Sequence, residues 1–137
     1  MKTMMKHKLL LALGLFAAVQ AAEAGVRIEH WQAPSGARVY FVESRALPIV
    51  DVQVDFSAGA ARDPVDKSGL AQLTRGLMDL GAGGMDENEV ATRLADLGAH
   101  LSGGADTDRA GVGLRTLAEP ATRAAAFAVL RAVIAEP

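Results

Sequence analysis

Hydrophobic and polar positions alternate in the first part of the chain, as is typical of β-strands. Val26 and Ile28 alternate with polar neighbours, residues 34–36 (Pro-Ser-Gly) form a turn signal, and residues 39–42 follow. This pattern predicts a β-hairpin. Residues 49–56 alternate more regularly, with valines and a phenylalanine at every second position and Asp or Gln between them. They predict a strand with one buried and one wetter face.

The next segment has the period of an amphipathic helix. Ser68 can cap this helix, which is expected to run to about residue 80 and to stop at Gly81. Its apolar stripe, which we expect to be buried, consists of Leu70, Leu73, Leu77 and Leu80. The opposite face carries Gln72, Arg75, Gly76 and Asp79. The glycine-rich residues 81–84 predict a flexible link.

A second helix is expected to begin at Asp86, because Glu89 three residues later completes a capping box, and Gly98 ends it. Residues 100–105 and 110–117 predict two strands around a polar turn, and Pro120 begins a third helix that runs to about residue 135. That helix is apolar nearly all round, so we expect it to be covered on more than one side.

The predicted order of elements is βββααββα. It indicates an α+β fold, a mostly antiparallel sheet with helices packed on one face. The chain ends directly after an apolar helix. We therefore expect a unit that is incomplete at its C-terminus, although domains of this size do stand alone.

The first 24 residues have the composition of a signal peptide. Three lysines precede the apolar residues 9–19, and Ala22-Glu23-Ala24 supplies the small-x-small cleavage pattern. At ~1.5 Å per residue this apolar run covers about half of a ~30 Å hydrocarbon core, too little for a good permanent span. We expect cleavage after Ala24, one domain over residues 25–137, and export to a periplasm with no membrane contact afterwards. An uncleaved N-terminal anchor is the alternative.

Composition excludes several classes of function. The chain contains no cysteine, which removes disulfides, thiolate zinc clusters and cysteine nucleophiles. A formal net charge of −2 gives no electrostatic reason to expect nucleic acid as a partner. Apolar residues make up 50% of the 137, which suits a folded domain and argues against a disordered chain.

Other candidate motifs are weak. His30 and His100 share no ligand spacing with each other or with an acidic pair, so a metal role is not favoured for them. Asp106 and Asp108 could suggest calcium, but the rest of a liganding loop is missing and a polar hairpin turn fits better. The glycines of residues 81–84 do not follow a strand of a βαβ unit, so a phosphate cradle is not expected.

The order and spacing of the motifs resemble the amino-terminal half-domain of pitrilysin/insulinase-type metallopeptidases. Residues 58–64 (Ala-Gly-Ala-Ala-Arg-Asp-Pro) and residues 68–71 (Ser-Gly-Leu-Ala) precede a helix that closes on Gly81. The Asp86-capped helix then runs into residues 97–99 (Leu-Gly-Ala), followed by strand, turn, strand and helix. Each motif is weak alone, but their order covers nearly the whole chain after residue 26.

In that family, the helix after Gly-Leu-Ala carries the inverted zinc motif His-x-x-Glu-His, with two histidines on one face and a general base beside them. Here, the three functional positions hold Gln72, Arg75 and Gly76. Neither Gln72 nor Gly76 offers an imidazole, and Arg75 stays protonated and repels a divalent cation. We therefore expect no catalytic residue, no metal and no cofactor in this chain. An active peptidase with unorthodox ligands remains an alternative.

The resemblance implies a role in a pair of chains. Such families contain chains that keep the zinc motif and partners that have lost it. We expect this chain to be the amino-terminal part of a non-catalytic subunit, which assists a zinc-bearing partner in periplasmic peptide and protein degradation. Zinc is expected only in that partner. The alternative is a non-enzymatic assembly or peptide-binding module of peptidase ancestry.

The resemblance also implies a site for extended peptides. In the family, the strand after the Leu-Gly-Ala helix end is an open sheet edge to which peptides add. The matching residues are Leu101, Ser102, Gly103, Gly104 and Ala105. Most are small, which would let another backbone approach closely. Alternatively, the two glycines merely loosen the end of a hairpin.

Overall fold

The computed structural model describes residues 25–137, which fall into two units that are described separately. One unit ends at Arg45 and the other is Ala46–Pro137. The predicted signal peptide and its cleavage after Ala24 lie outside the described residues. Within the described part of the chain, the helices are too short or too polar to cross a membrane.

The first unit contains the predicted β-hairpin. Strands β1 (Ile28–Gln32) and β2 (Arg38–Val42) pair in antiparallel register. The rings of His30 and Tyr40 stack across the hairpin with centroids 6.3 Å apart. Gly36 has a φ of 87°, which the turn between the strands requires and which a glycine adopts without strain.

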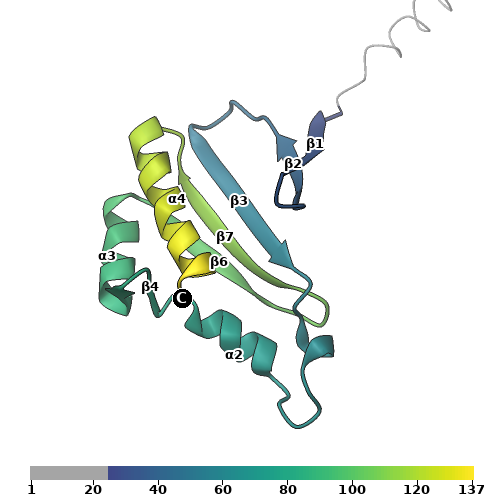
Figure 1. The fold of residues 1–137 in the computed structure, drawn as a ribbon. Coiled ribbons are helices and arrows are strands. Elements are labelled where there is room, and N and C mark those ends of the chain that lie inside the picture. Colours follow the sequence, from purple (N-terminus) through teal and green to yellow (C-terminus); the bar gives the residue numbers. More distant parts are fainter. Residues whose placement is uncertain (1–24) are drawn as a thin grey trace, which may run out of the picture. The chain divides into compact units, whose positions relative to one another are not determined.

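The second unit is built on a three-stranded antiparallel sheet (Figure 1). Strand β7 (Ala110–Leu117) lies in the centre, with β3 (Ile49–Phe56) on one side and β6 (His100–Ala105) on the other. As the alternation predicts, the β3 valines are half-buried and its Asp and Gln side chains are exposed. Phe56 is the exception, since it is 42% exposed at the end of the strand.

Helices cover the apolar face of this sheet, which confirms the α+β prediction. Helix α4 (Pro120–Ala135) lies along β7, and α3 (Glu87–Asp96) packs beside it (Figure 1). Helix α2 (Leu70–Leu77) contacts β6 and β7. The core where these elements meet consists of Ala82, Val90, Val112, Leu114, Ala126, Val129, Leu130 and Val133.

The predicted cap of α3 is confirmed and the link before it differs from expectation. The Asp86 carboxylate accepts a hydrogen bond from the Glu89 amide, and the Glu89 carboxylate accepts one from the Asp86 amide, both at 2.9 Å. Residues 81–84 are not a flexible link. Gly81–Ala82 (β4) pairs with Met85–Asp86 (β5), because two consecutive glycines with positive φ make the tight turn between them.

Helix α2 begins differently from the prediction. Ser68 does not cap it, since Gly69 occupies the N-cap position without a side-chain bond. The free amides are instead satisfied from the preceding loop, where the Asp63 carboxylate accepts from the amides of Gly69 at 2.8 Å and Ala71 at 3.0 Å. The α-helix also ends at Leu77, three residues before the predicted end. A short 3₁₀ helix, Ala60–Arg62, lies upstream.

The orientation of α2 is the largest departure from the prediction. The expected buried stripe is exposed, at 43% for Leu70, 60% for Leu73, 52% for Leu77 and 47% for Leu80. The buried side chain of α2 is Arg75, with 6% exposure. A guanidinium can be buried when carbonyl and carboxylate oxygens accept its protons, and the sheet edge under α2 supplies them.

Helix α4 is buried along one stripe in the described structure. Its buried residues are Ala126, Val129, Leu130 and Val133, while Phe127 is 36% exposed. The expectation of cover on more than one side is therefore wrong for the elements described. Some apolar side chains of this helix, such as that of Phe127, are therefore exposed in the described structure.

The N-terminus of α4 is held by a carboxylate. Pro120 occupies the first turn as predicted, and the Glu119 side chain accepts from the amides of Thr122 at 2.7 Å and Ala121 at 3.1 Å. These backbone bonds, the Thr122 bond most of all, hold the pKa of Glu119 below its ordinary value.

Acid should therefore weaken the start of α4. Glu119 has a lower pKa when folded than when unfolded, so its contribution is present above the ordinary glutamate value of about 4.3 and is lost as the pH falls through the lower folded value. We expect Glu119→Gln to flatten the acid limb of a stability-against-pH curve measured by urea unfolding. An acid limb of unchanged slope would contradict this role of Glu119.

Candidate functional site

The three positions of the degenerate zinc motif lie in α2 and do not converge. Gln72 and Gly76 are exposed, whereas Arg75 is buried against the sheet. Among the described residues, Arg75 is the charged side chain that is buried. The position that holds the general base in the zinc motif of the resembled family is therefore occupied here by a cation, whose side chain points into the fold.

Every nitrogen of the Arg75 guanidinium has an oxygen partner. Its Nε donates to the carbonyl oxygen of Gly111 in β7 at 2.8 Å, and its Nη2 donates to the carbonyl oxygen of Ser102 in β6 at 2.7 Å. Its Nη1 lies 3.5 Å from a carboxylate oxygen of Asp79, one turn further along α2. This side chain thus ties the helix to two adjacent strands through charge-assisted hydrogen bonds.

The motif residues do not fit a zinc ion. Zinc takes imidazole, thiolate or carboxylate ligands, and here the neighbouring donors are an amide, a protonated guanidinium and a residue without a side chain. In residues 25–137, no three His, Asp or Glu side chains come together in a way that could hold a metal ion. No chemical step through a metal can be derived for this helix.

The strand order of the three-stranded sheet is β3-β7-β6, so β6 is one of its edge strands. Its residues Ser102, Gly103 and Gly104 are exposed, and Leu101 and Ala105 are half-buried. Gly103 has a φ of 120°, and a Cβ at this position would overlap the carbonyl oxygen of Gly111. Only glycine tolerates this φ together with so close an approach of β6 to β7.

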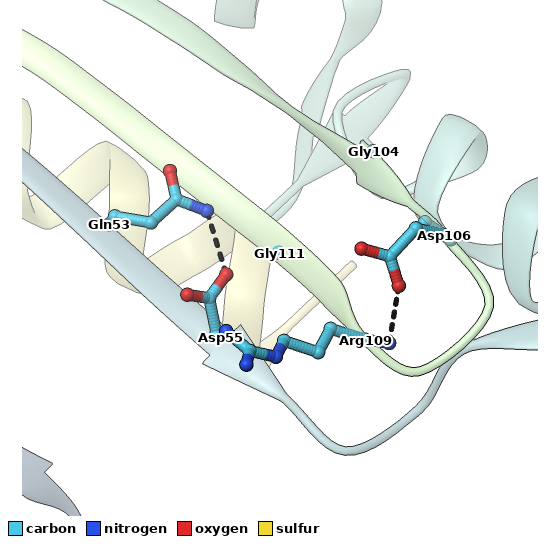
Figure 2. A pocket seen from close by; sticks show the side chains of 7 residues that line it. Gln53, Asp55, Gly104, Asp106, Arg109 and Gly111 are labelled. Atoms are coloured by element: carbon cyan, nitrogen blue, oxygen red, sulfur yellow. Dashed lines mark hydrogen bonds between the residues drawn. The ribbon is translucent and has the colours of Figure 1, made fainter.

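The open face of the same sheet carries a polar hollow of about 350 Å³ (Figure 2). It is lined by Gln53, Asp55, Gly104, Ala105, Asp106, Arg109 and Gly111. Figure 2 shows the Gln53 amide donating to the Asp55 carboxylate, a bond of 2.9 Å. A Cβ at Gly111 would overlap both of these side chains, so the glycine makes room for them.

The predicted polar turn closes one end of this hollow. The Asp106 carboxylate accepts from the amides of Asp108 at 2.7 Å and Arg109 at 2.8 Å, as expected for a hairpin turn. These bonds, first that of Arg109, hold the pKa of Asp106 below its usual range. These bonds and the pairing of β6 with β7 confirm the predicted hairpin turn.

Sequence reasoning missed the hollow and the partners of Arg75. Gln53 and Asp55 lie on the exposed face of β3 as predicted, but nothing in the pattern indicates that they reach over the glycines of β7. The helical pattern puts Arg75 opposite the apolar stripe and does not indicate that it contacts the sheet. The signal that could have indicated both is the alternation of Gly111 and Gly113 with Val112 and Leu114 in a central strand.

Comparison with known proteins identifies the fold. Neither a protein-family model nor a curated protein matches the chain. The chain is similar to the peptidase M16 inactive domain from Pseudomonas fluorescens, with a TM-score of 0.78 and 33% identity over 82% of this chain and 27% of that chain. A protease from Helicobacter pylori has a TM-score of 0.70 and 15% identity over 82% of this chain and 26% of that one.

The two likenesses have different weight. At 15% identity the second shows a shared fold alone, whereas the first extends to the sequence. The chain spans about a quarter of the length of each of these structures. Peptidase M16 is the pitrilysin/insulinase type that the sequence resembles. The resemblance is confirmed: this chain contains an M16-like half-domain, which is similar in sequence to part of an M16 inactive domain.

Proposed function

We propose that this chain is the amino-terminal part of a non-catalytic M16 subunit. It would work in the periplasm, beside a zinc-bearing peptidase of the same family, and assist that enzyme in degrading peptides and proteins. Zinc would be held by the partner. This chain would contribute a surface for extended peptides.

The observation that carries the proposal is the Arg75 guanidinium at the position of the general base. A general base must accept a proton, and a guanidinium that already donates to Gly111 and Ser102 cannot do so. The likeness to an M16 inactive domain supports the same conclusion. A half-domain without a base can still bind a substrate or position a partner.

The edge strand β6 supports a role in peptide binding. Extended peptides bind exposed sheet edges through backbone hydrogen bonds, and small edge residues let the two backbones approach. Ser102, Gly103 and Gly104 provide such an edge over three consecutive residues. The absence of large side chains there predicts weak preference for particular peptide side chains.

Turnover should require both chains. We expect the purified chain to leave a fluorogenic peptide uncleaved, a zinc-bearing M16 partner from the same cell to cleave it slowly, and the mixture to cleave it faster in a chelator-sensitive way. Cleavage by this chain alone would contradict the proposal. An equal rate for the partner with and without this chain would also contradict it.

Peptide binding at the edge can be tested separately with a matched pair of ligands. An extended peptide is compared with the same peptide carrying N-methyl groups on alternate backbone amides, which removes the donors that a β-ladder needs. We expect the unmodified peptide to bind and the methylated peptide to bind at least about tenfold more weakly, a difference of about 1.4 kcal/mol. Equal binding of the two peptides would exclude strand addition.

The outward apolar stripe of α2 favours a second candidate, a non-enzymatic assembly module. Leu70, Leu73 and Leu77 are exposed on consecutive turns of one helix, which is typical of a surface that contacts another protein. Replacing Leu73 and Leu77 with glutamate separates the two functions. An assembly module loses partner association with no change in peptide turnover, whereas the proposed subunit loses the stimulation of turnover as well.

A further inference from the structure

The carbonyl groups of Ser102 and Gly111 lie next to both Arg75 and Gly103. The Ser102 carbonyl, which accepts from Arg75 Nη2, belongs to the peptide unit that joins Ser102 to Gly103. The Gly111 carbonyl, which accepts from Arg75 Nε, is the group that a Cβ at Gly103 would overlap. The Gly103 backbone of β6 and the guanidinium of α2 therefore meet at the same pair of carbonyl groups.

This arrangement fixes the direction of a backbone donor at the sheet edge. A peptide unit is planar, so its N–H points opposite to its C=O. When Arg75 holds the Ser102 carbonyl, the Gly103 N–H is held in the opposite direction. Glycine at φ 120° is otherwise free to adopt many backbone conformations, so the guanidinium restricts the residue that is most able to move.

The leucines of α2 do not hold this helix on the sheet in place of the Arg75 hydrogen bonds. The leucines of α2 are turned outward, and Arg75 is the side chain of that helix that is buried. Asp79 lies next to the guanidinium on the helix side, so the site that surrounds it contains two carbonyl oxygens and one carboxylate. Such a site is shaped for a guanidinium cation and is left electronegative without one.

We propose that Arg75 is a positioning residue for peptide binding, which holds the Ser102–Gly103 segment of β6 in the conformation that receives an extended peptide. The residue that stands where the family has its base has thus gained a role in ligand binding. This inference rests on the proposed function, because it presumes that peptides bind at β6. It adds that the affinity depends on a side chain that does not touch the peptide.

Chemical rescue tests the proposal. We expect Arg75→Ala to bind the extended peptide at least about tenfold more weakly than the original chain, since hydrogen bonds to a charged group are lost at two carbonyls. Guanidinium chloride at a non-denaturing concentration should restore much of the affinity, and sodium chloride at equal ionic strength should not. Binding is measured at a temperature at which circular dichroism shows both chains folded.

Arg115→Ala is the matched control. Arg115, which lies on β7, is also an arginine, and it pairs with the Asp51 carboxylate through bonds of 2.7 and 2.9 Å on the exposed face of the sheet. We expect this variant to keep its peptide affinity and to gain nothing from guanidinium. Unchanged affinity of Arg75→Ala, or equal rescue of both variants by guanidinium, would overturn the inference.

A measurement on the unmodified chain covers the case in which Arg75→Ala does not fold. Peptide addition should slow hydrogen exchange at the Gly103 amide and shift the Arg75 Nε–H resonance, while the Arg115 Nε–H resonance stays in place. A bound peptide that leaves both Gly103 and Arg75 unchanged would overturn the inference alone. A chain that binds no peptide at all would instead contradict the proposed function.

Discussion

Replacing Arg75 with methionine is expected to lower the free energy of unfolding by about 3 kcal/mol. The change keeps an unbranched side chain but leaves the carbonyl groups of Gly111 and Ser102 without their donor, and an unsatisfied buried polar group costs about 1–3 kcal/mol. In a domain of this size, such a loss lowers the melting temperature by roughly 10–20 °C. Urea unfolding and a thermal scan measure both quantities.

The control for this prediction is Arg115→Met. Arg115 and Asp51 form a well-aligned pair on the sheet, and the pair lowers the pKa of Asp51 through the side-chain bond from Arg115. Because both groups are exposed to water, their pairing contributes little to stability. We expect a change much smaller than that at Arg75. Equal losses at the two arginines would show that the carbonyl contacts of Arg75 have no special weight.

Replacing Gly103 with alanine is expected to be equally damaging and also to abolish peptide binding. The φ of 120° is strained for any residue with a Cβ, and the new methyl group would overlap the Gly111 carbonyl, which cannot move without disturbing the central strand. We expect a loss of about 3 kcal/mol in the free energy of unfolding. Urea unfolding and peptide titration of the same protein measure the two effects.

The neighbouring glycine provides the control. A Cβ at Gly104 would meet nothing within 4 Å, and its φ is not in the left-handed region. We expect Gly104→Ala to leave stability nearly unchanged, and to weaken peptide binding only if the ligand backbone lies against residue 104. If both variants were equally stable, the fold would not require the positive φ at Gly103.

Most of the helices and strands could be predicted from the sequence, because they depend on interactions between residues close together in the chain. The alternation in residues 49–56, the capping box of Asp86 and Glu89, and Pro120 at a helix start all depend on near neighbours, and the structure confirms each of them. The prediction of a flexible link at residues 81–84 is wrong, because consecutive glycines also allow the positive φ values of a tight hairpin turn.

The environment of α2 could not be predicted in this way. A stripe of leucines at helical spacing normally faces a core, so Arg75 on the opposite face was expected to lie away from it. In the structure, the face of α2 that carries Arg75 lies against the sheet. The sheet offers the carbonyl groups of Ser102 and Gly111 there, which bind a cation and not a methyl group. Those acceptors lie 27 and 36 residues further along the chain, beyond the reach of any local pattern.

The degenerate motif is different, because its chemistry is visible in the residue types. Gln72, Arg75 and Gly76 lack the imidazoles and the carboxylate that zinc catalysis needs, and no fold can supply them at those positions. The sequence could not indicate that Arg75 donates hydrogen bonds to backbone carbonyl groups of the sheet. Its replacement by glutamate would therefore restore a base and remove a structural contact at the same time.

Zinc-edge anomalous diffraction from crystals soaked in a zinc salt tests the central claim most directly. The account predicts no anomalous peak bonded to the side chains of α2, with the Arg75 guanidinium still hydrogen-bonded to the carbonyl oxygens of Ser102 and Gly111. A zinc ion coordinated by side chains of this helix, with Arg75 displaced from the sheet, would contradict it.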